Sequence, residues 1–285
     1  MIGPDIVKRI VENKMGCSAT DLPVLDFEKN VTIDGDRPCL WTVGSVWRSI
    51  RPNDHVWGSG ALGNDWEFDA CYNTTRAMKH SNITVYSVRG PNTVAAIQRL
   101  CNGRINLPSL STTGIIEPRG DAGFLIPYIF PEYQYNPETA DKDKCVIAHY
   151  VEMKTLQKKL VQEDFPVTEN ECFNVIQPWQ TMVGNMTRCK ALVSSSLHGI
   201  ILADAFGLPV VWKKTFYLHT YKFDDYFLSF PDGHWNNSIG NYGFALKSLN
   251  DPKNIPKPIP APTRLEYAKN IIKSFPYHLF TTTPT

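Results

Sequence analysis

The chain opens with a stretch whose apolar positions recur at the spacing of a helix. Within residues 4–14, Ile6, Val7, Ile10 and Val11 share one face, and Pro4 suits the first turn. Short apolar runs follow and alternate with further helical patterns. We expect strands over residues 39–43, 54–57 and 83–88, and a helix over 92–101. This alternation of strand and helix is typical of a parallel α/β sheet.

The alternation breaks between Pro127 and Lys144, where three prolines and several charges are typical of a linker. It then restarts. We expect strands over 145–148, 173–176, 191–193 and 209–212, with helices over 152–163, 180–189 and about 197–206. A last helix is expected over 264–274, after a Pro-rich stretch that is long enough to return to the first domain.

The pattern therefore predicts an α/β chain with two Rossmann-like domains that face a cleft near residues 128–144. The expected boundaries are 1–133 for the first domain and 140–250 for the second, with 251–285 as the return segment and final helix. A chain of 285 residues with 42% hydrophobic residues is long enough to bury a core without metal or disulfide staples. This composition excludes a disordered chain.

Charge and cysteine content indicate the partners and the cellular compartment of the protein. The net charge of +1 gives no basic surplus, so we expect no nucleic-acid partner. No apolar run approaches the length of a membrane span, and the start lacks the pattern of a signal peptide. Seven cysteines without a CxxC pair favour free thiols and a cytoplasmic protein. Five N-x-S/T sequons, at Asn30, Asn73, Asn82, Asn185 and Asn236, keep a secretory-pathway lumen open as the alternative.

Ligands of open parallel sheets bind beyond the carboxyl ends of the strands. The polar residues expected at such positions are Gly58, Ser59, Gly60, Arg89, His149, Ser194, Ser195, Ser196 and His198. A cation, two imidazoles and exposed backbone amides suit an anionic ligand. Gly58, Gly60 and Gly63 fit a dinucleotide fingerprint only loosely and indicate a close-approach loop instead. No motif calls for a metal, because the two DxD sequences fall in apparent loops.

The serine run is the most informative of these segments. It joins an apolar strand to a small-residue helix, whose unpaired N–H groups and dipole favour an anion. His198 would lie in the first turn of that helix. The structural alternative is that the serines only cap the helix and His198 packs on a strand. His149 has a structural alternative too, and Arg89 could pair with Asp121 instead of a ligand.

Several segments together resemble the polysaccharide pyruvyl transferase family. They are similar, in family order, to vWGsG (residues 56–60), VRGPxT (88–93), GDPaLLLP (120–127), iPHY (147–150), SSSLHGiilAxAxGiP (194–209) and fKfxDYf (222–226). The resemblance implies a glycosyltransferase-B-like fold. It also implies transfer of the pyruvyl group of phosphoenolpyruvate to two hydroxyls of a sugar or glycan acceptor, which forms a ketal without a metal or cofactor.

The resemblance assigns roles to particular residues. His198 is the expected general acid or base and His149 a second proton-handling group, while Arg89 is the expected anion clamp. Substrate contacts are expected from Gly58, Ser59, Gly60, Ser194, Ser195, Ser196, Leu197 and Lys222. Many family members carry arginine where this chain has Ser196, so the positive charge would come from Lys213, Lys214 or Lys222. The family's first strand and its turn precede the segment matched by Ile2–Asp5, so we expect that strand to be missing here.

Two other classes of function stay open. A nucleotide-sugar glycosyltransferase of the same fold would use the same helix start for a diphosphate, but it needs an acidic residue for a ribose. No clear candidate for that residue follows a strand of the second domain. A non-catalytic sugar-binding relative is the third class. The acceptor sugar and the oligomeric state are not fixed by the sequence.

Overall fold

The computed structural model describes residues 3–15, 39–45, 47, 50, 53–63, 83–100, 105–106, 120–162, 165, 167–215, 220–230, 238–239 and 242–280. Its contacts divide the chain into two compact units. Unit 1 comprises residues 1–122, 224–229 and 269–285, and unit 2 comprises 123–223 and 230–268. The chain thus enters unit 2 twice, at residues 123 and 230, and returns to unit 1 after each passage. The predicted cleft between two domains stays a prediction.

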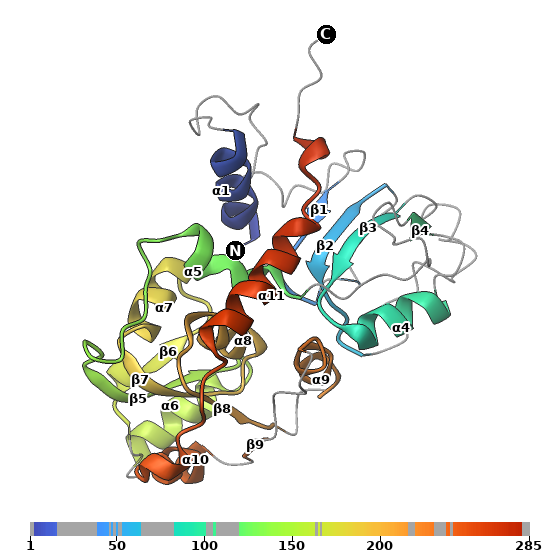
Figure 1. Cartoon of the computed structure of the whole chain (residues 1–285). Coiled ribbons are helices and arrows are strands. Elements are labelled where there is room, and N and C mark those ends of the chain that lie inside the picture. Colours follow the sequence, from blue (N-terminus) through green and yellow to red (C-terminus); the bar gives the residue numbers. More distant parts are fainter. Residues whose placement is uncertain are drawn as a thin grey trace. The chain divides into compact units, whose positions relative to one another are not determined.

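Unit 1 is built on a parallel sheet in the order β1-β2-β3-β4. Its elements are α1 (Gly3–Met15), β1 (Leu40–Trp41), β2 (His55–Ser59), β3 (Ile83–Val88), α4 (Pro91–Leu100), β4 (Ile105–Asn106) and the C-terminal turn η6 (Tyr277–Leu279). Figure 1 shows these strands side by side, with α4 beside β3. The β-branched residues Ile83, Val85 and Val88 of β3 are buried.

The C-terminal helix α11 (Ala261–Lys273) ends in unit 1, where it covers β2. The Trp57 indole is fully buried there and donates hydrogen bonds to the Ile271 carbonyl at 3.3 Å and to Ser274 Oγ at 3.1 Å. The ring of Phe275 meets that of Trp57 edge to face, with centroids 4.8 Å apart. A segment more than 200 residues away along the chain therefore completes the core of unit 1.

Unit 2 contains a second parallel sheet, in the order β6-β5-β7-β8-β9. Its strands are β5 (Lys142–Ala148), β6 (Cys172–Asn174), β7 (Cys189–Ser194), β8 (Val210–Lys213) and β9 (Ser238–Ile239). Its helices are η3 (Ala122–Leu125, from the unit boundary), α5 (Ile126–Ile129), α6 (Met153–Gln162), η4 (Glu169–Glu171), α7 (Trp179–Met186), α8 (Leu197–Phe206), α10 (Tyr242–Ser248) and η5 (Pro252–Asn254). Helix α9 (Tyr221–Phe227) begins in unit 2 and ends in unit 1.

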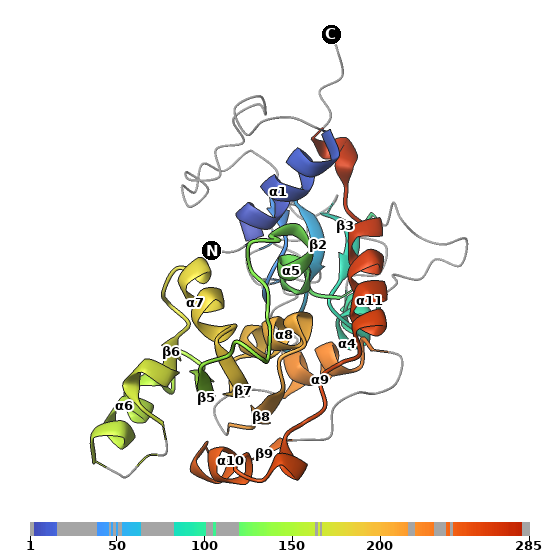
Figure 2. The same ribbon diagram turned by 60° about the vertical axis from the view of Figure 1, so that its left-hand side comes forward.

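Helices cover both faces of this second sheet. Figure 2 shows α7 and α8 on one side of it and α6 and α10 on the other. On the second side, alternate residues such as Val146 and Val193 pack with Leu156 of α6 and Leu246 of α10. Both sheets are parallel, so the predicted α/β class is confirmed. None of the helices in the described part of the chain is long and apolar enough to cross a membrane.

The strand order of unit 2 places a topological switch between β5 and β7. The chain passes from β5 through α6 to β6 on one side, and then through α7 to β7 on the other side of β5. The two connections leave β5 in opposite directions, so the loops that follow β5 and β7 diverge. Open α/β sheets bind ligands between two such loops, beyond the carboxyl ends of the strands. The segments that follow β5 and β7 begin at His149 and Ser195.

The expectation of free cysteines is wrong for one pair. Cys145 of β5 and Cys189 of β7 form a disulfide, with their Cα atoms 6.0 Å apart. The two strands are hydrogen-bonded neighbours, so the fold brings together residues that are 44 positions apart in the sequence. Cys39 and Cys172 are not in disulfides. Cys17, Cys71 and Cys101 lie outside the described residues.

Candidate active site

Two polar clusters lie at the carboxyl ends of the strands, one in each unit. The first, called the strand-end cluster below, belongs to unit 2. It comprises His149, Glu152, Ser195, His198, Lys213, Lys222 and Tyr242. The second belongs to unit 1 and is called the arginine cluster. It comprises Ser45, Ala61, Arg89, Thr93 and Asp225.

Ser195 joins the loop after β5 to the loop after β7. Its Oγ accepts a hydrogen bond from the His149 backbone N–H at 2.9 Å and donates to Glu152 Oε2 at 2.5 Å. The Tyr242 hydroxyl of α10 lies 2.6 Å from the same Oγ. Ser195 is fully buried. Its side chain therefore fixes the backbone that carries His149, and it is not placed to contact a ligand.

Glu152 is the charged centre of this network. It accepts hydrogen bonds from Lys213 Nζ at 2.5 Å and from the Tyr242 hydroxyl at 3.0 Å, in addition to that from Ser195. Burial opposes ionisation, but the Lys213 ammonium and the hydroxyl donors outweigh it and hold the pKa of the carboxyl below its usual value. Burial and the Glu152 charge raise the pKa of Tyr242, which stays a donor. Glu152 is thus an ionised, protein-bound carboxylate.

Helix α8 begins directly after the serine run. Ser196 occupies the N-cap position, but its side chain makes no capping hydrogen bond. Ser194 Oγ accepts from the Ser196 N–H at 3.1 Å and lies 2.9 Å from the Ile147 carbonyl, to which it can donate, so it braces the turn against β5. No serine side chain caps the first turn. The N–H groups of a helix's first turn favour an anion, and no serine side chain occupies them in α8.

His149 follows β5 and lies half-buried beside Lys222 and His198. Burial, followed by the Lys222 charge and the His198 imidazole, lowers the pKa of His149 to about 4, although Glu152 acts in the opposite direction. His149 is therefore neutral at pH 7. A neutral imidazole can accept a proton from a hydroxyl, which an imidazolium cannot do.

The lowered pKa of His149 predicts acid-sensitive stability. The unfolded chain binds a proton near pH 6.5 and the folded chain only near pH 4, so the free energy of unfolding falls as the pH drops through this window. Urea unfolding at intervals from pH 7 to pH 4.5 measures the slope. His149→Gln should flatten it only in part, because burial also lowers the pKa of His55 in unit 1. An unchanged slope in His149→Gln would contradict the assignment.

Gly199 allows α8 to lie close to the central strands. A Cβ atom there would come within 2.5 Å of Ser194 Oγ and 2.9 Å of Ile147 Cγ2. We expect Gly199→Ala to destabilise the protein by about 1–3 kcal/mol. Gly184 in α7 is the matched control, because a Cβ there has no neighbour within 4 Å. Gly184→Ala should stabilise by about 0.4–1 kcal/mol in the same urea titration. Equal effects of the two substitutions would exclude the close contact.

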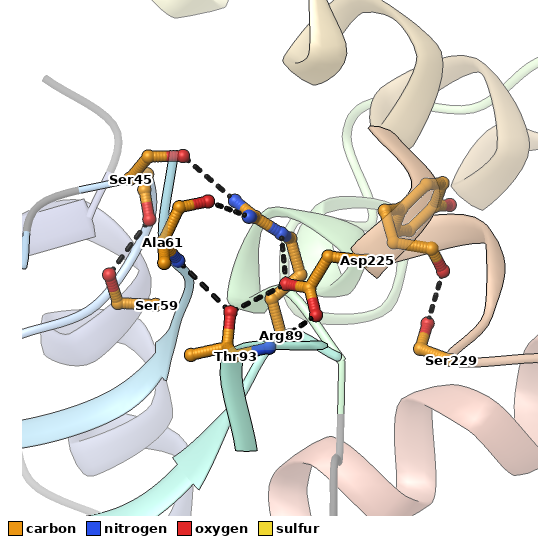
Figure 3. Close-up of polar contacts among 9 residues, drawn as sticks. Ser45, Ser59, Ala61, Arg89, Thr93, Asp225 and Ser229 are labelled. Atoms are coloured by element: carbon orange, nitrogen blue, oxygen red, sulfur yellow. Dashed lines mark hydrogen bonds and ion pairs between the residues drawn. The ribbon is translucent and has the colours of Figure 1, made fainter. Parts of the chain in front are cut away.

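Arg89 lies in the arginine cluster, shown in Figure 3. It is fully buried, and its Nε donates to Asp225 Oδ2 at 3.1 Å. Its Nη1 donates to Ser45 Oγ at 3.0 Å and its Nη2 to the Ala61 carbonyl at 2.7 Å. Asp225 Oδ1 and Oδ2 also accept from the Thr93 backbone N–H and hydroxyl, at 2.8 and 2.7 Å. All three guanidinium nitrogens are therefore engaged within the protein, which favours the structural alternative, with Asp225 as partner in place of Asp121.

Gly58, Ser59 and Gly60 are held by neighbours in unit 1. Gly58 has a left-handed φ of +76°, which favours glycine. Ser59 is fully buried and donates through Oγ to the Gly44 carbonyl at 2.8 Å. A Cβ atom on Gly60 would lie 2.3 Å from the Arg89 guanidinium carbon. Gly58 and Ser59 end strand β2, so the prediction of a loop is wrong for these two residues. The close approach is real at Gly60, and the approaching group is Arg89.

The structure thus sorts the predicted site residues into two sets. His149, His198, Lys222 and Ser194–Leu197 lie together near the carboxyl ends of β5 and β7 in unit 2. Arg89 and Gly58–Gly60 lie in unit 1. Among the described residues, no group of three or more His, Cys, Asp or Glu side chains could hold a metal ion. The expected absence of a cofactor stays a prediction.

Sequence reasoning missed Glu152, Tyr242 and Asp225. Glu152 stands three residues after His149, so its place beyond a strand end was a usable signal. Tyr242 is 90 residues from Glu152, and Asp225 is 136 residues from Arg89. Only the fold brings these pairs together. Lys213 ends β8, but its ammonium is paired with Glu152.

Comparisons with known proteins add one relative. No family model matches the chain. The chain is similar to the "Uncharacterized protein L143" of Acanthamoeba polyphaga mimivirus, with 32% identity over 180 residues. The matched region covers 62% of this chain and 53% of the relative, so the chain spans about half the length of the curated relative it matches.

Proposed function

We propose that the strand-end cluster binds phosphoenolpyruvate and that the chain transfers its pyruvyl group to two hydroxyls of a sugar, forming a cyclic ketal. The observation that supports this proposal best is a neutral imidazole, His149, which interacts with Lys222 and His198 at the topological switch of unit 2. This arrangement places proton-handling groups beside a cation and the start of α8. The ordered motifs that resemble the pyruvyl transferase family support the same reaction.

The charge of the site suits a small dianion. We assign Lys222 to the ligand, because its charge acts on His149 within the same cluster. Its side chain is 8% exposed, and its Nζ lies 5.3 Å from the centroid of the Phe223 ring. The first-turn N–H groups of α8 would bind a second oxyanion group. Phosphoenolpyruvate carries two such groups, a phosphate and a carboxylate.

The reaction needs two proton transfers, which two histidines can supply. One acceptor hydroxyl adds to the carbon that bears the phosphate oxygen, and a proton is added to the methylene carbon. The second hydroxyl then displaces phosphate from the same carbon. Of the two hydroxyl protons, one is needed for the new methyl group and the other leaves with phosphate. We assign proton donation and acceptance at the reacting atoms to His198 and removal of a hydroxyl proton to neutral His149.

The acceptor would approach from the exposed side of His149. Tyr150 follows it in the chain and is 59% exposed, with its ring centroid 4.5 Å from that of the His149 imidazole. Ile176, after the neighbouring strand β6, is 73% exposed. An exposed aromatic ring and an apolar side chain at this edge suit the apolar face of a sugar ring. The proposal includes a glycosyltransferase-B-like arrangement of the two units, as the family resemblance implies.

Ligand-induced stabilisation tests the binding step. Phosphoenolpyruvate should raise the thermal midpoint of the full chain, with a stabilisation of about 2.7 kcal/mol at roughly 100 times Kd. Lys222→Met should lose most of this shift relative to its own ligand-free midpoint. Lys214→Met is the matched control, because Lys214 is exposed and close in sequence, and it should respond as the wild type does.

The same titration separates the alternatives. A shift with nucleotide sugars and none with phosphoenolpyruvate would replace the proposal by a nucleotide-sugar glycosyltransferase. Glu152 is the carboxylate at a strand end that such an enzyme would use for a ribose, but it is bound by Lys213, Ser195 and Tyr242. A shift with free sugars alone would favour a non-catalytic sugar-binding protein.

A further inference from the structure

We propose that this chain folds in an oxidising compartment of the secretory pathway and carries an N-linked glycan on Asn185. Two independent features lead to this proposal. One is the Cys145–Cys189 disulfide, and the other is the partial exposure of Asn185 and Thr187 in the Asn185-Met186-Thr187 sequon at the end of α7. The proposal does not depend on the reaction that the strand-end cluster performs.

The disulfide identifies the kind of compartment. Cys145 and Cys189 are both fully buried, and β5 and β7 lie at the centre of the unit 2 sheet. Their bond forms when two thiols lose two protons and two electrons to a disulfide oxidant, which is reduced to a dithiol. Such oxidants act in the secretory pathway, whereas cytosolic thiols are kept reduced. The disulfide therefore favours the secretory lumen over the cytoplasm expected from the sequence.

Asn185 is accessible in the folded protein. The buried face of α7 consists of Trp179, Met182, Val183 and Met186. Asn185 stands outside that face and is half-buried, and its side-chain amide forms no hydrogen bond within the described part of the chain. A glycan on Asn185 Nδ2 would displace no contact of the core.

The position of Asn185 keeps a glycan away from the strand-end cluster. Asn185 precedes β7 and lies near its amino end, whereas His149 and Ser195 follow the carboxyl ends of β5 and β7. In the modification, Asn185 Nδ2 bonds to the anomeric carbon of a lipid-diphosphate-linked oligosaccharide. The bond from that carbon to the diphosphate oxygen breaks, the lipid diphosphate leaves, and one amide proton passes to a base.

Peptide mapping of the full chain isolated from the cells that naturally produce it tests both features. Trypsin releases residues 160–188 as one peptide whose only sequon is Asn185. After enzymatic removal of glycans in heavy-oxygen water, this peptide should carry labelled aspartate at position 185. A non-reducing digest should contain the peptide 145–154 joined to 189–190. An unmodified Asn185 would overturn the glycan, and free thiols at Cys145 and Cys189 would overturn the compartment.

Substitutions at Thr187 supply a matched pair for the sequon. The Thr187 hydroxyl donates to the Val183 carbonyl at 3.1 Å and caps α7, so removing it can also affect folding. Thr187→Ser keeps both the hydroxyl and the sequon and should keep the glycan. Thr187→Val keeps the shape of the threonine side chain, and Asn185→Gln keeps a side-chain amide. Both variants should lose the glycan and retain the disulfide. Modification that persists in Thr187→Val would exclude the sequon as its cause.

Discussion

Asp225→Asn should lower the free energy of unfolding by about 3–5 kcal/mol, because it leaves the Arg89 guanidinium buried without its counter-charge. Both side chains are fully buried, 3.1 Å apart. The same carboxylate binds the Thr93 N–H in the first turn of α4. Loss of the charge therefore weakens a helix start as well as an ion pair. Urea unfolding, with hydrogen exchange of β3 and α4, measures the effect.

Asp224→Asn is the matched control. Asp224 neighbours Asp225 on α9 but is exposed, so its substitution should change stability by no more than about 0.5 kcal/mol. Arg89→Ala should resemble Asp225→Asn. The role of anion clamp that the family resemblance assigns to Arg89 predicts a different result, namely weaker phosphoenolpyruvate binding in Arg89→Ala. If both Asp225→Asn and Arg89→Ala unfold as the wild type does, the arginine cluster is not structural.

His198→Gln should lower kcat for pyruvyl transfer by about 10²–10⁴-fold, because glutamine can donate a hydrogen bond but cannot exchange a proton at neutral pH. The stability should change by no more than about 1 kcal/mol, since His198 lies half-buried in the first turn of α8. Phosphate release from phosphoenolpyruvate with a galactose- or mannose-bearing acceptor measures the rate. The thermal shift with phosphoenolpyruvate should persist, which separates proton transfer from binding.

His149→Gln provides the second arm of this experiment. The rate of the wild type should fall as acid protonates the neutral His149 base, toward pH 4 in the free enzyme. His149→Gln should be slow at every pH and should lose that acid limb. A wild-type rate in His198→Gln, or an unchanged acid limb in His149→Gln, would remove the corresponding histidine from the mechanism.

Much of the architecture could be predicted from periodicity. Helix α1 and strand β3 match the expected ranges to within about one residue, and α8 begins where the serine run predicted it. Helices α9 and α10 were not predicted. Each has only seven residues, and the aromatic sequence of α9 has no clear helical period. The predicted linker holds α5, and β5 begins at Lys142 instead of Cys145.

The site was predictable only where it depends on strand ends. His149 and His198 follow strands that proved to be neighbours, which the rule for parallel sheets anticipates. Arg89 follows a strand as well, but its partner Asp225 is on α9. This helix comes after the first four strands of unit 2 along the chain and ends in unit 1. No local sequence pattern predicts that the chain returns to unit 1 at this point. Tyr242, one partner of Glu152, is likewise far away in the sequence, at a separation of 90 residues.

Phosphate release by the chain of residues 1–285 is the most direct test of the proposed reaction. With phosphoenolpyruvate and a galactose- or mannose-bearing acceptor, the wild type should release one phosphate for each pyruvate ketal formed, as measured by mass spectrometry of the glycan. His198→Gln should release almost none while still binding phosphoenolpyruvate. Tight binding of a nucleotide sugar, with no phosphate release with any acceptor, would contradict pyruvyl transfer.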